Sequence, residues 1–230
     1  MVRSIVKLSF AVLLAVYTVP AQAVEVINNG NFESGLTGWT GYITALGTIS
    51  PVPGYAGGTP NLPVVNSFDV SGSGASNALV LNAGANPSSS TREGGGVTQT
   101  FTTTGGIATF SADIAAFTRV LGDGGLGLLS VLLDGVVLDS HDFGAADGPI
   151  TFRSELDFTV NLAAGTHTIA LQSTRLFAPA SGVRSQYFDN VSLDVTAAVP
   201  EPSTGAMMIL GFAGVGFMTY RRRKTAALAA

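Results

Sequence analysis

Hydrophobic and polar residues alternate in several segments in the middle of the chain, which predicts β-strands with one buried and one exposed face. The clearest examples are residues 107–115 and 152–160. Residues 165–173 and 187–195 show the same alternation. No segment of this region has the apolar spacing of a helix, so the middle of the chain is predicted to be all-β.

An Asp134-Gly135 pair separates the apolar segments 128–133 and 136–140, which predicts a β-hairpin because both turn residues tolerate positive φ. Apolar residues occur on both faces of this hairpin, so we expect it to lie inside its sheet. Residues 42–76 show little periodicity and are expected to form a long ordered excursion or a variable loop, so no strand is placed there. Hairpin-linked strands over about 175 residues predict an antiparallel β-sandwich of the jelly-roll type, with a closed barrel as the alternative.

The N-terminus has the pattern of a secretory signal peptide. Arg3 and Lys7 precede an apolar run at 8–16, and Ala21-Gln22-Ala23 offers small residues to a signal peptidase. Nine apolar residues are too few to cross a hydrocarbon layer of ~30 Å, which argues against the alternative of an uncleaved anchor. Residues 1–23 are therefore predicted to be removed during export.

The C-terminus combines two prolines, an uncharged stretch and a basic block. Prolines before residue 204 stop earlier structure from continuing into the stretch 204–220. That stretch predicts one apolar helix of roughly 25 Å, which suffices for a thin bilayer. The basic block at 221–224 would remain cytoplasmic. A simple single-span membrane anchor is the alternative to a processed signal.

These C-terminal features together resemble the PEP-CTERM sorting signal of exported bacterial proteins, over residues 199–224. The residues that carry the resemblance are the sorting motif Pro200, Glu201 and Pro202 and the basic stop Arg221, Arg222, Arg223 and Lys224. The resemblance implies recognition by an exosortase, cleavage near the motif, and delivery to the cell surface or to extracellular polymer. The chain thus divides into 1–23, a β-sandwich domain at 24–198, and 199–224.

Composition excludes several classes of function. The whole chain has a formal net charge of -4, but residues 24–198 contain five arginines, no lysine and fourteen acidic residues. A protein that binds phosphates needs clustered basic residues, so nucleic-acid binding is excluded for this domain. The chain has no cysteine, which excludes disulfides and a thiol nucleophile.

Candidate catalytic groups are few. His167 shares strand alternation with Ile169 and is expected to cap an apolar face rather than serve as a base. His141 lies in a sequence typical of a solvated turn, with a His-Asp metal site as the less favoured alternative. Glu155 and Asp157 would lie ~7 Å apart on one wet strand face, whereas a glycosidase needs carboxyl groups on both sides of a bond. The sequence therefore predicts a protein that is not an enzyme.

Two motifs frame the domain. They are Asn29 to Gly35 with Gly38-Trp39-Thr40 near its start, and Tyr187 to Leu193 near its end. Together they resemble the opening and closing motifs of galactose-binding-like jelly rolls, which include several families of carbohydrate-binding modules. The resemblance implies a structural Ca²⁺ between the first and last strands, at Glu33 and Asp189, helped by backbone carbonyls around Asn28 to Phe32.

Strand alternation bears on the same proposal. Asp189 alternates with Val191 and Leu193, which would turn its carboxylate toward the core, where it needs a partner. A hard cation would relieve the repulsion between two nearby carboxylates. The alternative is a β-bulge at Asp189 that turns the side chain to water.

Aromatic residues are the natural platforms for a sugar ligand. Trp39 and Tyr42 are the candidate ligand-binding residues, although Trp39 is also expected to have a structural role at the sandwich edge. The leading hypothesis is an exported, non-catalytic surface or matrix protein. The alternatives are a carbohydrate-binding module for exopolysaccharide and a carboxylate-based glycan hydrolase. Two acids from different strands in one hollow would favour the hydrolase.

Overall fold

The computed structural model describes residues 22–49, 63–85, 91–119, 125–176, 184–197 and 202–227. The predicted signal peptide, with the exception of residues 22 and 23, lies outside the described residues, as do Pro200 and Glu201. By their contacts, the residues of the chain divide into two compact units, one of them 22–197.

Thirteen strands make up the described part of the β unit. The first sheet contains β1 (Ala23–Glu25), β4 (Val64–Phe68), β5 (Ser76–Val80), β8 (Gly106–Thr118), β11 (Ile150–Leu162) and β13 (Arg184–Thr196). The second contains β2 (Thr40–Ile43), β7 (Glu93–Thr103), β9 (Leu128–Leu133), β10 (Val136–Asp142) and β12 (Gly165–Arg175). A small sheet pairs β3 (Gly47–Ile49) with β6 (Ala83–Ala85).

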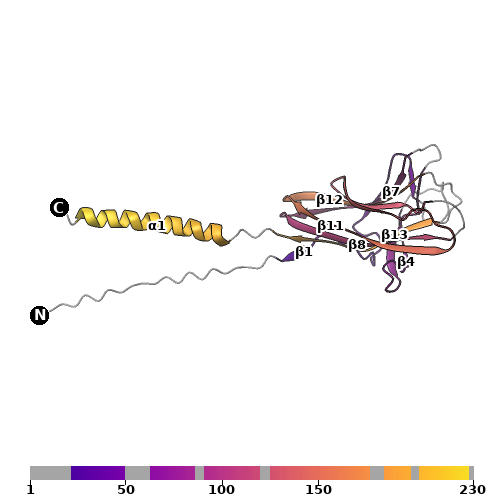
Figure 1. Ribbon diagram of the computed structural model, residues 1–230, viewed down its shortest axis with the longest axis horizontal. Coiled ribbons are helices and arrows are strands. Elements are labelled where there is room, and N and C mark those ends of the chain that lie inside the picture. The colour runs from indigo at the N-terminus through magenta and orange to yellow at the C-terminus, as the bar shows by residue number, and fades with distance from the viewer. Residues whose placement is uncertain are drawn as a thin grey trace. The chain divides into compact units, whose positions relative to one another are not determined.

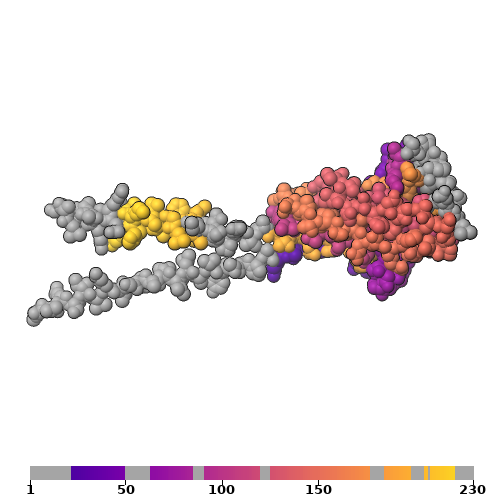
Figure 2. Space-filling view, in the orientation of Figure 1, coloured from indigo at the N-terminus to yellow at the C-terminus, as the bar shows by residue number. Residues whose placement is uncertain are grey.

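The two large sheets form the predicted antiparallel β-sandwich (Figure 1). The strand order is β11-β8-β13-β5-β4 in the first sheet, where β1 also pairs with β13, and β10-β9-β12-β7-β2 in the second. The hairpin of β4 and β5, purple in Figure 2, projects from the body of the sandwich. All-β architecture is thereby confirmed.

Alternation explains why these strands bury one face. On β8, Ala108, Phe110 and Ala112 are buried, whereas Thr109 and Ser111 between them are exposed. On β11, Leu156 and Phe158 lie opposite Ala112 and Phe110, and the rings of Phe158 and Phe110 stack at 5.0 Å. Side chains of this kind from both sheets form the main core. The opposite side of the first sheet is called the outer face below.

The β9–β10 hairpin has the predicted turn but not the predicted place. Asp134 and Gly135 adopt φ values of 51° and 81°, as the dipeptide requires. Strand β10, however, is the edge of its sheet, and Val136 and Val137 are 61% and 53% exposed. The prediction that the whole hairpin lies inside the sheet is therefore wrong for β10. Apolar residues at this edge face solvent instead of a neighbouring strand.

Seven strands, β1 to β7, lie outside the segments that were predicted as strands. Strands β3 and β4, residues 42–43 of β2 and the start of β5 fall in the region 42–76, where no strand was placed. In strand β7, Glu93 is followed by three glycines, which leave no side-chain alternation to detect. A Cβ atom on Gly96 would lie 1.8 Å from the carbonyl oxygen of Leu171 on β12, so glycine permits the close approach of these strands.

The C-terminal segment forms α1 (Pro202–Ala227). Its first residue is Pro202, a position at which proline is tolerated because the first turn lacks an intrahelical acceptor for its nitrogen. Among the described residues, no helix combines the length and the apolar character needed for a membrane crossing. The transmembrane assignment of 204–220 stays a prediction.

Candidate functional site

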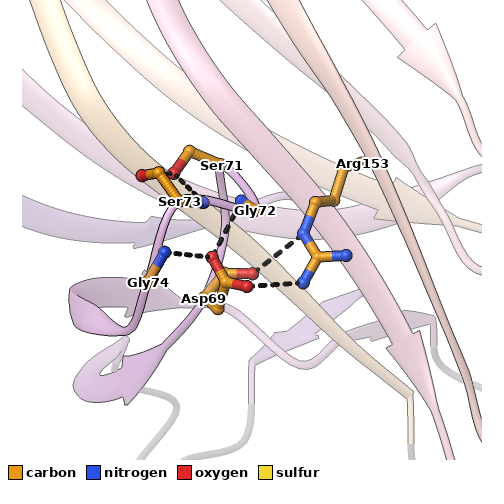
Figure 3. Close-up of polar contacts among 6 residues, drawn as sticks. All are labelled: Asp69, Ser71, Gly72, Ser73, Gly74 and Arg153. Carbon is orange, nitrogen blue, oxygen red and sulfur yellow. Dashed lines mark hydrogen bonds and ion pairs between the residues drawn. The ribbon is translucent and has the colours of Figure 1, made fainter.

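The loop between β4 and β5 is fastened to the outer face of the first sheet by one arginine (Figure 3). Arg153 on β11 donates from Nε to the carbonyl oxygen of Asp69 at 3.1 Å and from Nη2 to Oδ2 of Asp69 at 3.0 Å. Oδ1 of Asp69 accepts hydrogen bonds from the backbone of Gly72 at 2.8 Å and Gly74 at 3.1 Å. A single aspartate thus organises the loop and joins it to a distant strand.

A groove of about 390 Å³ lies between this loop and the sheet. It is lined by Val70, Ser71, Asp113, Arg153, Ser154 and Glu155. Asp69 neutralises the guanidinium of Arg153, so the carboxylates of Asp113 and Glu155 give the groove its negative charge. No described residue donates a hydrogen bond to Glu155, which leaves its carboxylate oxygens available to a ligand.

Three carboxylates lie side by side on the outer face. Asp113 on β8 is the direct cross-strand partner of Glu155 on β11 and of Asp189 on β13. Directly opposed residues have Cβ atoms about 4.5–5.5 Å apart, and like charges there repel. Asn190 offsets part of this repulsion, because its Nδ2 donates to Oδ2 of Asp113 at 2.7 Å.

Asp189 faces the opposite direction from the one that alternation predicts. The pairing register shifts between Asp189 and Ser192, and Asn190 adopts a φ of 50°, so a β-bulge is present. The bulge places Asp189 on the outer face while Val191 and Leu193 point into the core. Both sequence interpretations were incomplete, because Asp189 is nevertheless only 1% exposed.

Protein donors satisfy the buried carboxylate of Asp189. It accepts hydrogen bonds from the hydroxyl of Ser76 and from the backbone nitrogen of Asn190. Burial raises the pKa of Asp189, and the nearby carboxylates of Asp113 and Glu33 add to that rise. Burial together with the two neighbouring carboxylates therefore outweighs the hydrogen bonds that favour the ionised form of Asp189.

Glu33, the other predicted metal ligand, is exposed and accepts hydrogen bonds from Asn77, which follows Ser76 on β5. Its carboxylate accepts from the backbone nitrogen of Asn77 at 3.2 Å and from Nδ2 of Asn77 at 2.7 Å. The structure thus brings Glu33 and Asp189 to successive residues of β5.

The backbone carbonyls expected to complete a calcium site are already used. Those of Asn28, Asn29 and Gly30 accept hydrogen bonds from Gln99, Trp39 and Val191 respectively. Among the described residues, no group of three or more His, Cys, Asp or Glu side chains is arranged to hold a metal ion. As placed, the residues do not form an oxygen cage for Ca²⁺, and a cation would have to displace protein donors.

The aromatic candidates lie mostly inside the fold. Trp39 is 7% exposed, packs against Phe32 at 5.7 Å, and donates from Nε1 to the carbonyl oxygen of Asn29. These contacts favour its structural role. Tyr42 is half-buried, and burial raises its pKa to about 12. Tyr187 stacks on Phe68 at 3.8 Å beneath the β4–β5 hairpin.

The two histidines make their main contacts outside the groove, although His141 lies next to the lining residue Ser154. Nδ1 of His167 is 2.7 Å from Oδ2 of Asp134, and its ring packs 5.7 Å from Phe101, in agreement with the capping role. His141 on β10 packs edge-on against Phe143, and its Nδ1 is 3.4 Å from the hydroxyl of Ser154. Neither histidine lines the groove.

Sequence reasoning missed most of the groove. Asp113 interrupts an otherwise apolar and small-residue stretch at 112–116, and that charged residue was a usable signal. Asp69 and Arg153 are 84 residues apart, and only the fold brings them together.

Comparison with known proteins identifies the C-terminal segment. Residues 198–224 match the model of the PEP-CTERM protein-sorting motif, which confirms the predicted resemblance of this segment. This motif implies export, sorting to the cell surface and processing by an exosortase. The comparison with curated proteins gives no match.

Solved structures with a similar fold include carbohydrate-binding modules and enzymes. The CBM22-1–GH10 modules of xylanase Xyn10B from Clostridium thermocellum are 14% identical, with a TM-score of 0.41, over 76% of this chain and 29% of that chain. A family 35 carbohydrate-binding module from the same organism is 13% identical, with a TM-score of 0.33, over 77% of this chain and 100% of that module.

A third similar structure is TmCBM61, solved in complex with β-1,4-galactotriose. It is 13% identical, with a TM-score of 0.37, over 74% of this chain and 97% of that chain. The chain thus spans less than a third of the length of the xylanase but nearly all of the isolated modules. These similarities concern the fold alone.

Proposed function

We propose that this chain is a non-catalytic protein of the cell surface or extracellular matrix, carried there as a membrane-anchored precursor and released by an exosortase. The observation that carries the proposal is the match of residues 198–224 to the sorting motif. The predicted signal peptide at the other terminus supports the same route, because it would direct the β-sandwich out of the cytoplasm.

The sorting step can be tested in a bacterium that has the matching exosortase. Replacement of Pro200 and Pro202 by alanine is expected to leave full-length protein in the membrane fraction, whereas the wild-type chain reaches the surface in shortened form. A matched control replaces Pro63, which precedes β4, and should leave sorting unchanged. Equal surface delivery of both variants would contradict the proposal.

A second candidate function is carbohydrate binding, and the groove beside Arg153 is the feature that favours it. The free carboxylate of Glu155 and the hydroxyl of Ser71 offer hydrogen-bond acceptors of the kind that hold sugar hydroxyls. Isothermal titration with exopolysaccharide fragments should give binding that Glu155→Gln weakens and that Asp147→Asn, outside the groove lining, leaves unchanged. Binding unaffected by Glu155→Gln would exclude the groove as the ligand site.

The groove also meets one requirement of a hydrolase, since it holds two acids from different strands, Asp113 and Glu155. Direct pairing places both carboxylates on one face of the sheet, however. Glycosidases place them on opposite sides of the bond that is cleaved. This geometry supports binding without catalysis, and release of reducing ends that is lost in Glu155→Gln would overturn that conclusion.

Calcium support of the fold at Glu33 and Asp189 is a further element of the proposal. It is supported by the carboxylates of Asp113 and Glu33 near Asp189, whose mutual repulsion a divalent cation would offset. Binding would require Asn77 and Ser76 to release the two carboxylates.

A further inference from the structure

The first and last described residues of the sandwich lie at the same end of the sandwich. Strand β1 pairs antiparallel with the end of β13, so Ala23 lies opposite Thr196 (Figure 1). The turns at 104–105 and 163–164 lie at this end too, because Gly106 and Leu162 are cross-strand partners and Gly165 pairs with Thr103. We call this end, with residues 22–24, 102–108, 161–166 and 195–197, the terminal pole.

The terminal pole has no charged residue. The parts of β7, β8, β11 and β12 that meet there come from segments with little charge, since residues 94–112 contain no charged residue and residues 158–174 contain only His167. Strands β1 and β13 carry Glu25 and Asp194 directly beside the pole. The opposite ends of the same strands carry many charges, among them Glu93, Arg119, Arg153, Arg175 and Arg184. Charge is therefore distributed unevenly along the strands of a domain that is strongly acidic as a whole.

Apolar side chains are exposed where the charges are missing. Val24 on β1 is 60% exposed and Ile107 on β8 is 52% exposed. The turn of the β9–β10 hairpin points in the same direction, and Val136 and Val137 beside it are exposed. Because Leu133 pairs with Ile169, this turn ends several residues short of the turns at 104–105 and 163–164. Apolar side chains that are exposed at one end of a fold can contact an apolar phase or a partner.

The nearest ionisable groups are held away from this surface or paired. The carboxylate of Glu25 accepts hydrogen bonds from Ile27 at 2.7 Å and Leu193 at 3.0 Å, and from the hydroxyl of Ser192, all on the side away from the pole. Asp134 pairs with His167. Asp194, two residues from the end of β13, is half-buried and marks the edge of the uncharged surface.

The short segment between the sandwich and α1 indicates that a membrane is the partner of this surface. Only residues 198–201 separate the end of the sandwich from the start of α1. An extended chain spans at most about 3.6 Å per residue, so a membrane that holds α1 lies within ~18 Å of the terminal pole. In the unprocessed chain, the signal peptide would hold Ala23 to the same membrane.

We propose that the terminal pole rests on the lipid surface in the membrane-anchored precursor, with Val24 and Ile107 at the interface and Val136 and Val137 at its margin. The inference rests on the proposed membrane anchor. Docking orients the acidic groove and the charged opposite end away from the lipid, and it is lost when the sorting signal is cleaved, because two isolated aliphatic side chains bind lipid only weakly without a tether.

The test uses the full chain, which has no cysteine of its own. Single variants Ile107→Cys and Val136→Cys are labelled with an environment-sensitive fluorophore and reconstituted into vesicles of phosphatidylcholine and phosphatidylglycerol. Leu176→Cys is the matched control, since Leu176 is equally apolar, 55% exposed, and follows β12 at the opposite end of the sandwich. The fluorescence of Trp39 confirms that each variant is folded.

Docking predicts that a quencher attached to the lipid chains quenches the label at Ile107 strongly, the label at Val136 less, and the label at Leu176 hardly at all. Equal quenching at Ile107 and Leu176, or none at either, overturns the inference. A label at Ile107 that is shielded from an aqueous quencher but beyond reach of the lipid quencher identifies a protein partner or second copy instead.

Flotation of the vesicles separates the two proposals. If the chain floats with the vesicles and Ile107 is not quenched, the anchor stands and docking is wrong. If the chain does not float, the proposed anchor fails and docking fails with it.

Discussion

Arg153 and Asp69, 84 residues apart, are joined by two hydrogen bonds that tie the β4–β5 loop to strand β11. One hydrogen bond is to the Asp69 side chain and the other to its backbone carbonyl, so the guanidinium fixes both the position and the orientation of Asp69. The side chains are 38% and 35% exposed. Solvent therefore screens the pair, and its value lies in shaping the groove more than in stability.

Replacement of Arg153 by glutamine should loosen the loop at little cost to the fold. Because the pair is partly exposed, we expect a loss of about 0.5 kcal/mol in the free energy of unfolding, smaller at high salt. Limited proteolysis should detect faster cleavage between residues 69 and 75.

Asp69→Asn provides the second arm of a double-mutant cycle, because asparagine can still accept hydrogen bonds from Gly72 and Gly74. Nonadditive effects of the two substitutions would measure the ion pair itself. Fully additive effects would show that the charges of Arg153 and Asp69 do not interact in solution.

The Asp134–His167 pair predicts a stability that depends on pH. Asp134 and the carbonyl of Ala163 raise the pKa of His167 above 6.5, so its contribution is complete below that pH and lost as pH rises through the native value. His167 and the backbone of Thr168 lower the pKa of Asp134 below 3.8, so that contribution is lost as pH falls through the lowered value.

Asp134→Asn should therefore lower the melting temperature most between about pH 4 and 6.5, the interval that the two reference pKa values define. Asp134 is about half exposed, so we expect on the order of 0.5 kcal/mol. The fluorescence of Trp39 can follow unfolding of the full chain in detergent across pH. The same destabilisation at pH 5.5 and pH 9 would contradict a charge interaction.

Asp189→Asn is expected to stabilise the protein at pH 7 in the presence of a chelator. The native pKa of Asp189 is raised by burial, so its favourable contribution is complete below 3.8 and lost as pH rises through the native value. Asparagine mimics the protonated state. The gain in melting temperature should disappear near pH 4.

The same two chains, wild type and Asp189→Asn, can be compared with and without Ca²⁺. If Ca²⁺ binds Glu33 and Asp189, it should raise the melting temperature of the wild-type chain and leave Asp189→Asn unchanged. Mg²⁺ serves as the ionic-strength control. An equal response of both chains to Ca²⁺ would remove calcium from the proposal.

Gly30 connects the opening motif to β13 and should tolerate no side chain. Its carbonyl oxygen accepts a hydrogen bond from Val191 at 3.0 Å, and a Cβ atom would lie 1.8 Å from the carbonyl oxygen of Val191. Gly30→Ala should cost about 1–3 kcal/mol or more in the free energy of unfolding. Chemical denaturation of the full chain, followed through Trp39, measures the loss.

The matched control is Gly125→Ala, since a Cβ atom there meets only the carbonyl oxygen of Gly144 at 3.8 Å. That variant should remain close to wild type. Similar losses in both variants would mean that backbone flexibility, and not the close approach at Val191, explains the effect.

Patterns within single sequence segments were enough to predict the strands that bury one face and the tightest turn. Alternation located β8 and β11, because each buries one face, and Asp134-Gly135 located the β9–β10 turn. The same patterns did not predict β7, because its glycines at 94–96 have no side chains and lie directly against the backbone of neighbouring strands. Edge position also escaped prediction, since the exposed Val136 and Val137 have the composition of an interior strand.

The candidate site was harder to predict because it depends on contacts between distant segments. One extra residue in β13 moves Asp189 to the other face of the sheet, and the local sequence offered this bulge only as one of two alternatives. Asp113 and Glu155 become neighbours only through the pairing of β8 with β11. The C-terminal sorting motif was predictable because it is a continuous segment whose chemistry does not depend on the fold.

Mass spectrometry of the C-terminal peptide, recovered from cells that have the exosortase, tests the central claim most directly. Cleavage near Pro200 to Pro202 should yield a mature chain that lacks α1 and the basic residues Arg221 to Lys224. Recovery of surface-exposed protein that still ends at Ala230 would contradict the account.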